Sequence, residues 1–319
     1  MNMNEQKGEG QVETWRSTQL LSGHTTVVGV IGWPVEHSVS PQMHNAALHA
    51  LGLDWCYVPF AVRPERLPQA IAGMRALGLR GLNATVPHKQ ALLSLMDELT
   101  PEARAIGAVN TVLMREEGLL GHNTDAQGFL RALREAGFEP QGCSALVLGA
   151  GGVARAIVYA LLSVGASLML LNRTLARAEA LAREFSAYGK MLLEAGPLDA
   201  STLRRACSRA DLIVNATTLG MWPQVETTPW PEEGTFPSDA FCYDVVYNPR
   251  ETRWLCQARA AGCAAVDGLG MLVHQGAEAL ELWTGQSAPV QVMRAACERA
   301  LADCTSRGMP MAHAALGGK

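Results

Sequence analysis

The chain has 319 residues, 48% of them apolar, which is enough for about two domains with hydrophobic cores of their own. Its 26 basic and 30 acidic side chains are scattered, which excludes the concentrated positive charge that nucleic-acid-binding proteins need. Apolar runs fall well short of the roughly 20 residues that span a bilayer, and the polar N-terminus lacks the pattern of a secretory signal, so a cytoplasmic protein is expected.

The first half of the chain alternates between short apolar runs and helical patterns. A polar stretch at residues 1–24 is expected to be a flexible tail. Strands are then expected at residues 27–31, 56–62 and 81–86, and helices at residues 43–51, 65–77 and 102–106. This alternation predicts an α/β domain with a mainly parallel sheet.

A second alternation begins at Ser144. Strands are expected at residues 145–149, 167–172, 211–217 and 242–247, and helices at residues 154–164 and 175–185. This order predicts a Rossmann-like, doubly wound domain, in which ligands bind at the carboxyl ends of the strands. Beyond residue 268 only helices are expected, at residues 271–282 and 290–301, followed by a flexible tail at residues 307–319. The pattern alone does not say which domain these helices join.

A glycine-rich segment follows the first strand of this second pattern and opens its helix. It has the G-x-G-x-x-G/A spacing of a dinucleotide-binding loop and consists of Gly149, Ala150, Gly151, Gly152 and Val153. Glycines let the backbone approach a pyrophosphate, and the helix N-terminus offers free amides and a positive dipole end. An ordinary strand-to-helix turn is the alternative, but position and spacing together favour a cofactor.

The residues after the next strand favour NADP over NAD. An NAD-binding domain usually has an acidic residue here for the ribose hydroxyl, whereas this chain has Asn172, Arg173, Thr174 and Arg177. The two arginines can form charge-assisted hydrogen bonds with a 2′-phosphate. The alternative is a pair of solvated arginines at an exposed helix start.

Polar clusters near strand ends in the first half predict a substrate site. Ser38 and Ser40 could donate hydrogen bonds to a carboxylate, although Ser40 followed by Pro41 could instead cap a helix. Oxidising an alcohol with a nicotinamide requires a group that takes the hydroxyl proton, and Lys89 beside Asp125 can do so. Alone, either residue would be read as a solvated surface charge. No metal is expected, because the eight cysteines form no CxxC pair.

Nine motifs in this order resemble the shikimate dehydrogenase family. They are GWPVEHSVSPQMHN, NATVPHK, GAVNT, GHNTDAQGF, GAGGVARA, NRT, DLIVNAT, YDVVYNP and DGLGMLVHQGAEA, and they extend over about residues 26 to 303. The resemblance implies a substrate-binding domain at residues 25–124, an NADP-binding domain at residues 125–267, and C-terminal helices at residues 268–306 that return to the substrate domain. The active site would then lie in the cleft between the domains.

The resemblance also implies roles for individual residues. Lys89 would accept the hydroxyl proton, with Asp125 as its partner. The residues implied to bind the substrate are Ser38, Ser40, Asn83, Thr85, Asn110, Tyr247 and Gln275. Those implied to bind NADP are Gly149, Ala150, Gly151, Gly152, Val153, Asn172, Arg173, Thr174, Arg177, Thr217, Val245 and Gly268. The chain departs from the family pattern at Ala84, where Val is common, and at Val245, where Met is common.

The implied activity is the reversible, NADPH-dependent reduction of 3-dehydroshikimate to shikimate, a step of chorismate and aromatic amino acid biosynthesis. One alternative is a quinate/shikimate dehydrogenase of broader specificity, since quinate carries one more hydroxyl and a single pocket contact could admit it. Another is a non-catalytic protein that senses ligand levels with the same fold. The implied partners are small molecules, and the chain is expected to be a monomer or a homodimer.

Overall fold

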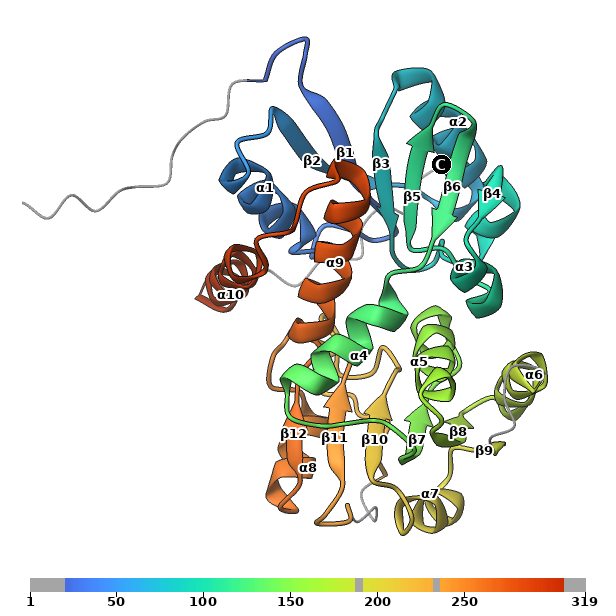
Figure 1. The fold of residues 1–319 in the computed structure, drawn as a ribbon. Helices are drawn as coiled ribbons and strands as arrows, with labels where there is room; N and C mark the ends of the chain where they lie inside the picture. Colours follow the sequence, from blue (N-terminus) through green and yellow to red (C-terminus); the bar gives the residue numbers. More distant parts are fainter. Residues whose placement is uncertain (1–20, 187–191, 232–235, 307–319) are drawn as a thin grey trace, which may run out of the picture.

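The computed structural model of the chain describes residues 21–186, 192–231 and 236–306. They form two lobes, each built around one six-stranded sheet (Figure 1). The predicted α/β class with two mostly parallel sheets is therefore confirmed. Residues 1–20 and 307–319, which belong to the expected tails, lie outside the described residues.

The first sheet has the strand order β2-β1-β3-β5-β6-β4. Its strands are β1 (Thr26–Gly32), β2 (Trp55–Ala61), β3 (Gly81–Ala84), β4 (Glu98–Leu99), β5 (Thr111–Arg115) and β6 (Gly118–His122). β1 is parallel to both β2 and β3, whereas β5 is antiparallel to β3 and β6. The sequence did not predict the β5–β6 hairpin, because these strands are short and contain glycine, arginine and histidine.

The helices of the first lobe are α1 (Ser40–Ala50), α2 (Leu67–Leu77) and α3 (Pro101–Ile106), with 3-10 turns at Pro64–Arg66 and Ala91–Leu95. The three predicted helices are thus confirmed to within three residues at each end. Val39 occupies the cap position of α1, and no side chain caps this helix. The interpretation of Ser40 as the capping residue is therefore wrong, because Ser40 is already inside the helix and its hydroxyl turns elsewhere.

The second sheet is entirely parallel, with the order β12-β11-β10-β7-β8-β9. Its strands are β7 (Ser144–Leu148), β8 (Ser167–Asn172), β9 (Leu193–Pro197), β10 (Leu212–Asn215), β11 (Phe241–Asp244) and β12 (Ala264–Val266). Its helices are α5 (Gly152–Ser163), α6 (Leu175–Phe185), α7 (Ala200–Cys207) and α8 (Arg253–Ala260). The chain builds outward from β7 in one direction and then in the other, which is the predicted doubly wound order.

Two helices connect the lobes. α4 (Asp125–Glu135) leaves the first lobe directly after β6, and α9 (Leu269–Thr284) lies beside it on the way back (Figure 1). α10 (Val290–Ser306) then packs against α1. One hydrophobic core joins residues of β1 and α1 to residues of α9 and α10, so the C-terminal helices complete the core of the first lobe. Among the described residues, no helix is long and apolar enough to cross a membrane.

Candidate active site

A cavity of about 190 Å³ lies between the lobes, where strands of both sheets end. From the first lobe and the linking helices, the predicted residues that line it are Ser38, Ser40, Asn83, Thr85, Lys89, Asp125 and Gln275. From the second lobe they are Val153, Thr217, Val245, Tyr247 and Gly268. Residues distant in the sequence therefore meet around one space, because parallel strands bring the loops at their carboxyl ends together.

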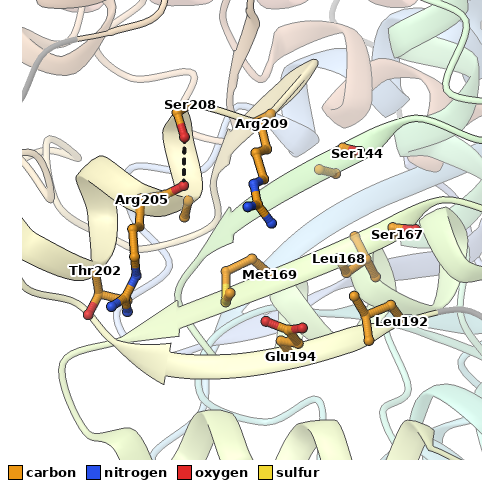
Figure 2. Close-up of a pocket in the computed structure, with 13 residues that line it drawn as sticks. Ser144, Ser167, Leu168, Met169, Leu192, Glu194, Thr202, Arg205, Ser208 and Arg209 are labelled. Atoms are coloured by element: carbon orange, nitrogen blue, oxygen red, sulfur yellow. Dashed lines mark hydrogen bonds between the residues drawn. The ribbon is translucent and has the colours of Figure 1, made fainter.

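Two larger and more open depressions lie elsewhere. One, of about 390 Å³, lies around the first residues of β7, β8 and β9, and Arg205, Arg209 and Glu194 are among the residues that line it (Figure 2). The other, of about 520 Å³, contains Arg250, Arg259 and Arg294 together with acidic side chains. Neither contains a predicted site residue. In open α/β sheets ligands bind at the carboxyl ends of the strands, so the smaller cavity between the lobes is the candidate active site.

Lys89 and Asp125 form an ion pair at this cavity. The Lys89 Nζ lies 2.8 Å from the Asp125 Oδ2, and the two side chains are 14% and 5% exposed. The Lys89 carbonyl accepts a hydrogen bond from the Val109 amide, and the neighbouring His88 ring bonds to the Val62 carbonyl, so the loop after β3 is fixed. Asp125 is the first residue of α4, where the positive end of the helix dipole favours a carboxylate.

Asn110 lies behind this pair and does not line the cavity. It is 2% exposed. Its Nδ2 donates to Asp125 Oδ1 at 2.8 Å and to Gln275 Oε1 at 3.4 Å, while its Oδ1 accepts from the Thr124 amide at 2.8 Å. The structure therefore places Asn110 where it orients Asp125 and Gln275, and its contact with the substrate stays a prediction.

The two serines lie at the other end of the cavity. The Ser38 side chain lies beside the partly buried phenol of Tyr247, whose pKa is raised to about 12 by desolvation. His37 also lines this end, and burial lowers its pKa, so its ring is neutral near pH 7. Its ring centroid is 5.8 Å from that of Trp222 on the second lobe. Hydroxyl groups and neutral rings from both lobes therefore surround this end of the space.

The residue-by-residue prediction missed other lining side chains, which are mostly apolar. They include His37, Met221, Met271 and Leu272. All but Met221 belong to the motifs GWPVEHSVSPQMHN and DGLGMLVHQGAEA. Within those motifs the prediction assigned polar side chains and one glycine, since an apolar side chain carries no chemical signal of contact with a ligand.

The glycine-rich loop fits a dinucleotide. Gly149 has φ +107°, and a Cβ there would lie 2.9 Å from the Ala216 carbonyl oxygen, so only glycine suits this turn. Gly151 precedes α5 with open space in front of it, and no side chain caps the helix. A Cβ at Gly152 would lie 3.6 Å from the Lys89 side chain. The N-terminus of α5, with its free amides, therefore lies close to Lys89 across the cleft.

The residues predicted to bind the adenosine ribose and its phosphate lie at and after the end of β8, the strand next to β7 in the sheet. Asn172 ends this strand, and its Nδ2 donates to the Thr174 carbonyl at 2.9 Å. Arg173, Thr174 and Arg177 are exposed at the start of α6, outside the cavity lining. They share the carboxyl edge of the sheet with the glycine-rich loop, which is where the adenosine end of a dinucleotide lies in this fold. Within the described ranges, no cluster of three or more His, Cys, Asp or Glu side chains could hold a metal.

Three family models match the chain. They are the shikimate dehydrogenase substrate binding domain at residues 30–112, shikimate / quinate 5-dehydrogenase at residues 132–221, and the shikimate 5'-dehydrogenase C-terminal domain at residues 268–298. The shikimate dehydrogenase (NADP(+)) of Moorella thermoacetica is 48% identical over 274 residues, which cover 86% of this chain and 92% of the relative. The chain belongs to the shikimate dehydrogenase family.

Solved shikimate dehydrogenase structures share the fold. That of the Thermus thermophilus enzyme, in complex with NADP(H) and shikimate, is 44% identical with a TM-score of 0.78, covering 86% of this chain and 100% of that one. Quinate dehydrogenase from Corynebacterium glutamicum, in complex with NAD, is 35% identical with a TM-score of 0.78, covering 86% and 99%. The family predicted from the nine motifs is therefore confirmed.

Proposed function

We propose that this member of the shikimate dehydrogenase family catalyses the reversible reduction of 3-dehydroshikimate to shikimate with NADPH, in chorismate and aromatic amino acid biosynthesis. The observation that carries the proposal is the ion pair of Lys89 and Asp125, which shares one cavity with residues of the NADP-binding lobe. The relative from Moorella thermoacetica is named for the same activity and cofactor.

The substrate would span the cavity from the serines to the ion pair. Ser38 and Ser40 would donate hydrogen bonds to its carboxylate, with Tyr247 beside them. Asn83, Thr85 and Gln275 would bind ring hydroxyls. Because these groups come from separate elements that are fixed before binding, they would hold the reacting hydroxyl at Lys89 without reorganisation.

Lys89 would move the proton of the reaction. In the direction of oxidation the Lys89 side chain, in its neutral amine form, would take the proton of the reacting hydroxyl, and the Asp125 carboxylate, 2.8 Å away, would stabilise the ammonium that results. Asn110 holds the other carboxylate oxygen and so keeps Asp125 in place. When bound, NADP supplies the hydride acceptor. The loop from Gly149 to Val153 would hold its pyrophosphate, Arg173 and Arg177 its 2′-phosphate, and Val245 and Gly268 would lie beside the nicotinamide.

The proposed substrate domain comprises residues 25–124 and 268–306, and the proposed NADP domain residues 125–267. The core that α9 and α10 share with β1 and α1 supports this division. The cytoplasmic location and the choice between monomer and homodimer remain predictions.

A quinate/shikimate dehydrogenase of broader specificity is the alternative. The similarity to a quinate dehydrogenase that binds NAD supports it, whereas Arg173 in place of an acidic residue argues for NADP. Initial rates with shikimate and with quinate, each with NADP and with NAD, separate the candidates. We expect shikimate with NADP to give the highest kcat/KM. Comparable rates with quinate would favour the alternative, and ligand binding without turnover would indicate a sensor.

A further inference from the structure

Tyr57 lies next to the candidate active site but is not among the residues that line the cavity. It belongs to β2 and is 2% exposed. Its hydroxyl donates to Asn83 Oδ1 at 2.8 Å, and the Ser40 side chain lies beside the same hydroxyl. Ser40 and Asn83 both line the cavity. One buried hydroxyl therefore contacts two residues that line the cavity.

The hydrogen bond from Tyr57 fixes how Asn83 is presented. The Asn83 Nδ2 donates to the Asn110 carbonyl at 3.2 Å and to Thr111 Oγ1 at 3.1 Å. With these two donors used and Oδ1 accepting from Tyr57, the amide has one favourable orientation, and a single lone pair of Oδ1 remains for a ligand. Loss of the Tyr57 hydroxyl would leave this orientation less well defined.

The Tyr57 ring is itself held by α1. Ser40 and His44 are four residues apart on this helix and so share a face, and both contact Tyr57. The His44 and Tyr57 rings stack with centroids 4.2 Å apart and an interplanar angle of 1°. His44 is fully buried, which lowers its pKa to about 3, and neither ring nitrogen has a hydrogen-bond partner. The neutral imidazole thus fixes the ring while Ser40 contacts the hydroxyl.

We infer that Tyr57 is a positioning residue, which sets the placement of Ser40 and Asn83 and thereby the affinity for the carboxylate-bearing substrate. This inference rests on the proposed role of Ser40 in binding the carboxylate. Tyr57 touches neither the reacting hydroxyl nor the ion pair, so its effect should appear in KM for shikimate and not in kcat.

The test compares Tyr57→Phe with Tyr243→Phe, another fully buried tyrosine, whose hydroxyl accepts a hydrogen bond from the Met271 amide. Tyr57→Phe keeps the ring stack, so we expect it to fold, to raise KM for shikimate about tenfold and to leave kcat and KM for NADP nearly unchanged. It should also reduce the preference for shikimate over its carboxamide. Tyr243→Phe should lower thermal stability without changing KM for shikimate.

A wild-type KM and an unchanged preference in Tyr57→Phe would overturn the inference, and so would equal effects of the two Tyr→Phe changes on KM. Ser40→Ala tests the proposed carboxylate site separately from the role of Tyr57. If Ser40→Ala leaves KM for shikimate and the carboxamide preference unaltered, the proposed carboxylate site is wrong. If it raises KM while Tyr57→Phe does not, only the inference fails. Should Tyr57→Phe not fold, His44→Leu removes the ring stack and must raise KM for shikimate.

Discussion

Lys89 is the single lysine among the described residues of a chain that contains 22 arginines and four lysines. An arginine would pair with Asp125 equally well, but its guanidinium stays protonated in proteins and cannot accept a proton. The proposed proton transfer would therefore require an amine at this position, and the ion pair with Asp125 holds this amine in place.

Replacing this lysine should separate proton transfer from cofactor binding. Lys89→Ala should lower kcat by about 10²- to 10⁴-fold while leaving the Kd for NADP nearly unchanged, because the proton acceptor is lost and the glycine-rich loop is intact. Steady-state rates and NADP titration measure the two effects. Lys89→Arg is the matched control that keeps the charge. Substantial activity in Lys89→Arg would show that charge alone suffices and that Lys89 does not take the proton.

Arg173 should determine the choice of cofactor. Arg173→Gln should raise KM for NADP about tenfold or more and change KM for NAD little, because only NADP carries the 2′-phosphate that the guanidinium would bind. The control is Arg209→Gln. Arg209 lies near the amino ends of the strands of the same sheet, so this change should alter neither KM value. Equal losses for both cofactors in Arg173→Gln would exclude a specific contact with the phosphate.

Gly268 and Gly151 each stand directly before a helix that begins at the cleft. Glycine is needed at these two positions for different reasons. A Cβ at Gly268, just before α9, would collide with the Val245 carbonyl oxygen, which belongs to the backbone and cannot turn aside. A Cβ at Gly151, just before α5, would meet no atom, and its φ of −93° suits any residue. The packing of the protein therefore requires glycine at position 268, whereas at position 151 only a bound ligand would require it.

Alanine at each position should give opposite results. Gly268→Ala should destabilise the fold by roughly 1–3 kcal/mol, the usual cost of overpacking. Gly151→Ala should leave stability unchanged but weaken NADP binding about tenfold, because the methyl group enters the space of the pyrophosphate. Thermal unfolding and NADP titration measure the two quantities. Normal NADP affinity in Gly151→Ala would contradict the proposed position of the pyrophosphate.

At the scale of the whole molecule, Glu278 on α9 links stability to pH. Its side chain is 14% exposed, and burial raises its pKa from 4.5 to about 7, with Arg131 opposing the shift. Between these pH values the folded protein keeps a proton that the unfolded chain releases. The contribution of Glu278 is therefore favourable below about pH 4.5 and is lost as the pH rises through 7.

Glu278→Gln should remove this dependence. The variant should be more stable than the wild type by about 3 kcal/mol near pH 8, and the difference should vanish below pH 4.5, where the wild-type carboxyl is neutral in both states. Denaturant unfolding across this range measures the difference. A constant difference at all pH values would mean that Glu278 affects stability through packing and not through its proton.

The sequence by itself determined the family, the doubly wound second lobe and the chemical types of the site residues. These depend on local signals: apolar strands, the glycines of a tight turn, and motifs whose order and composition are specific. It did not predict β9, β12 or the β5–β6 hairpin, since short, polar or edge strands are defined by their neighbours and not by their own residues.

Tertiary structure alone decided which of these residues meet. Lys89 and Asp125, 36 residues apart, were paired beforehand only through the family resemblance, and Gln275 joins them through Asn110 from a helix near the end of the chain. Likewise, Tyr57 is an ordinary strand residue until α1 and β3 bring Ser40 and Asn83 to its hydroxyl. Such contacts arise from packing of distant segments, so no local pattern encodes them.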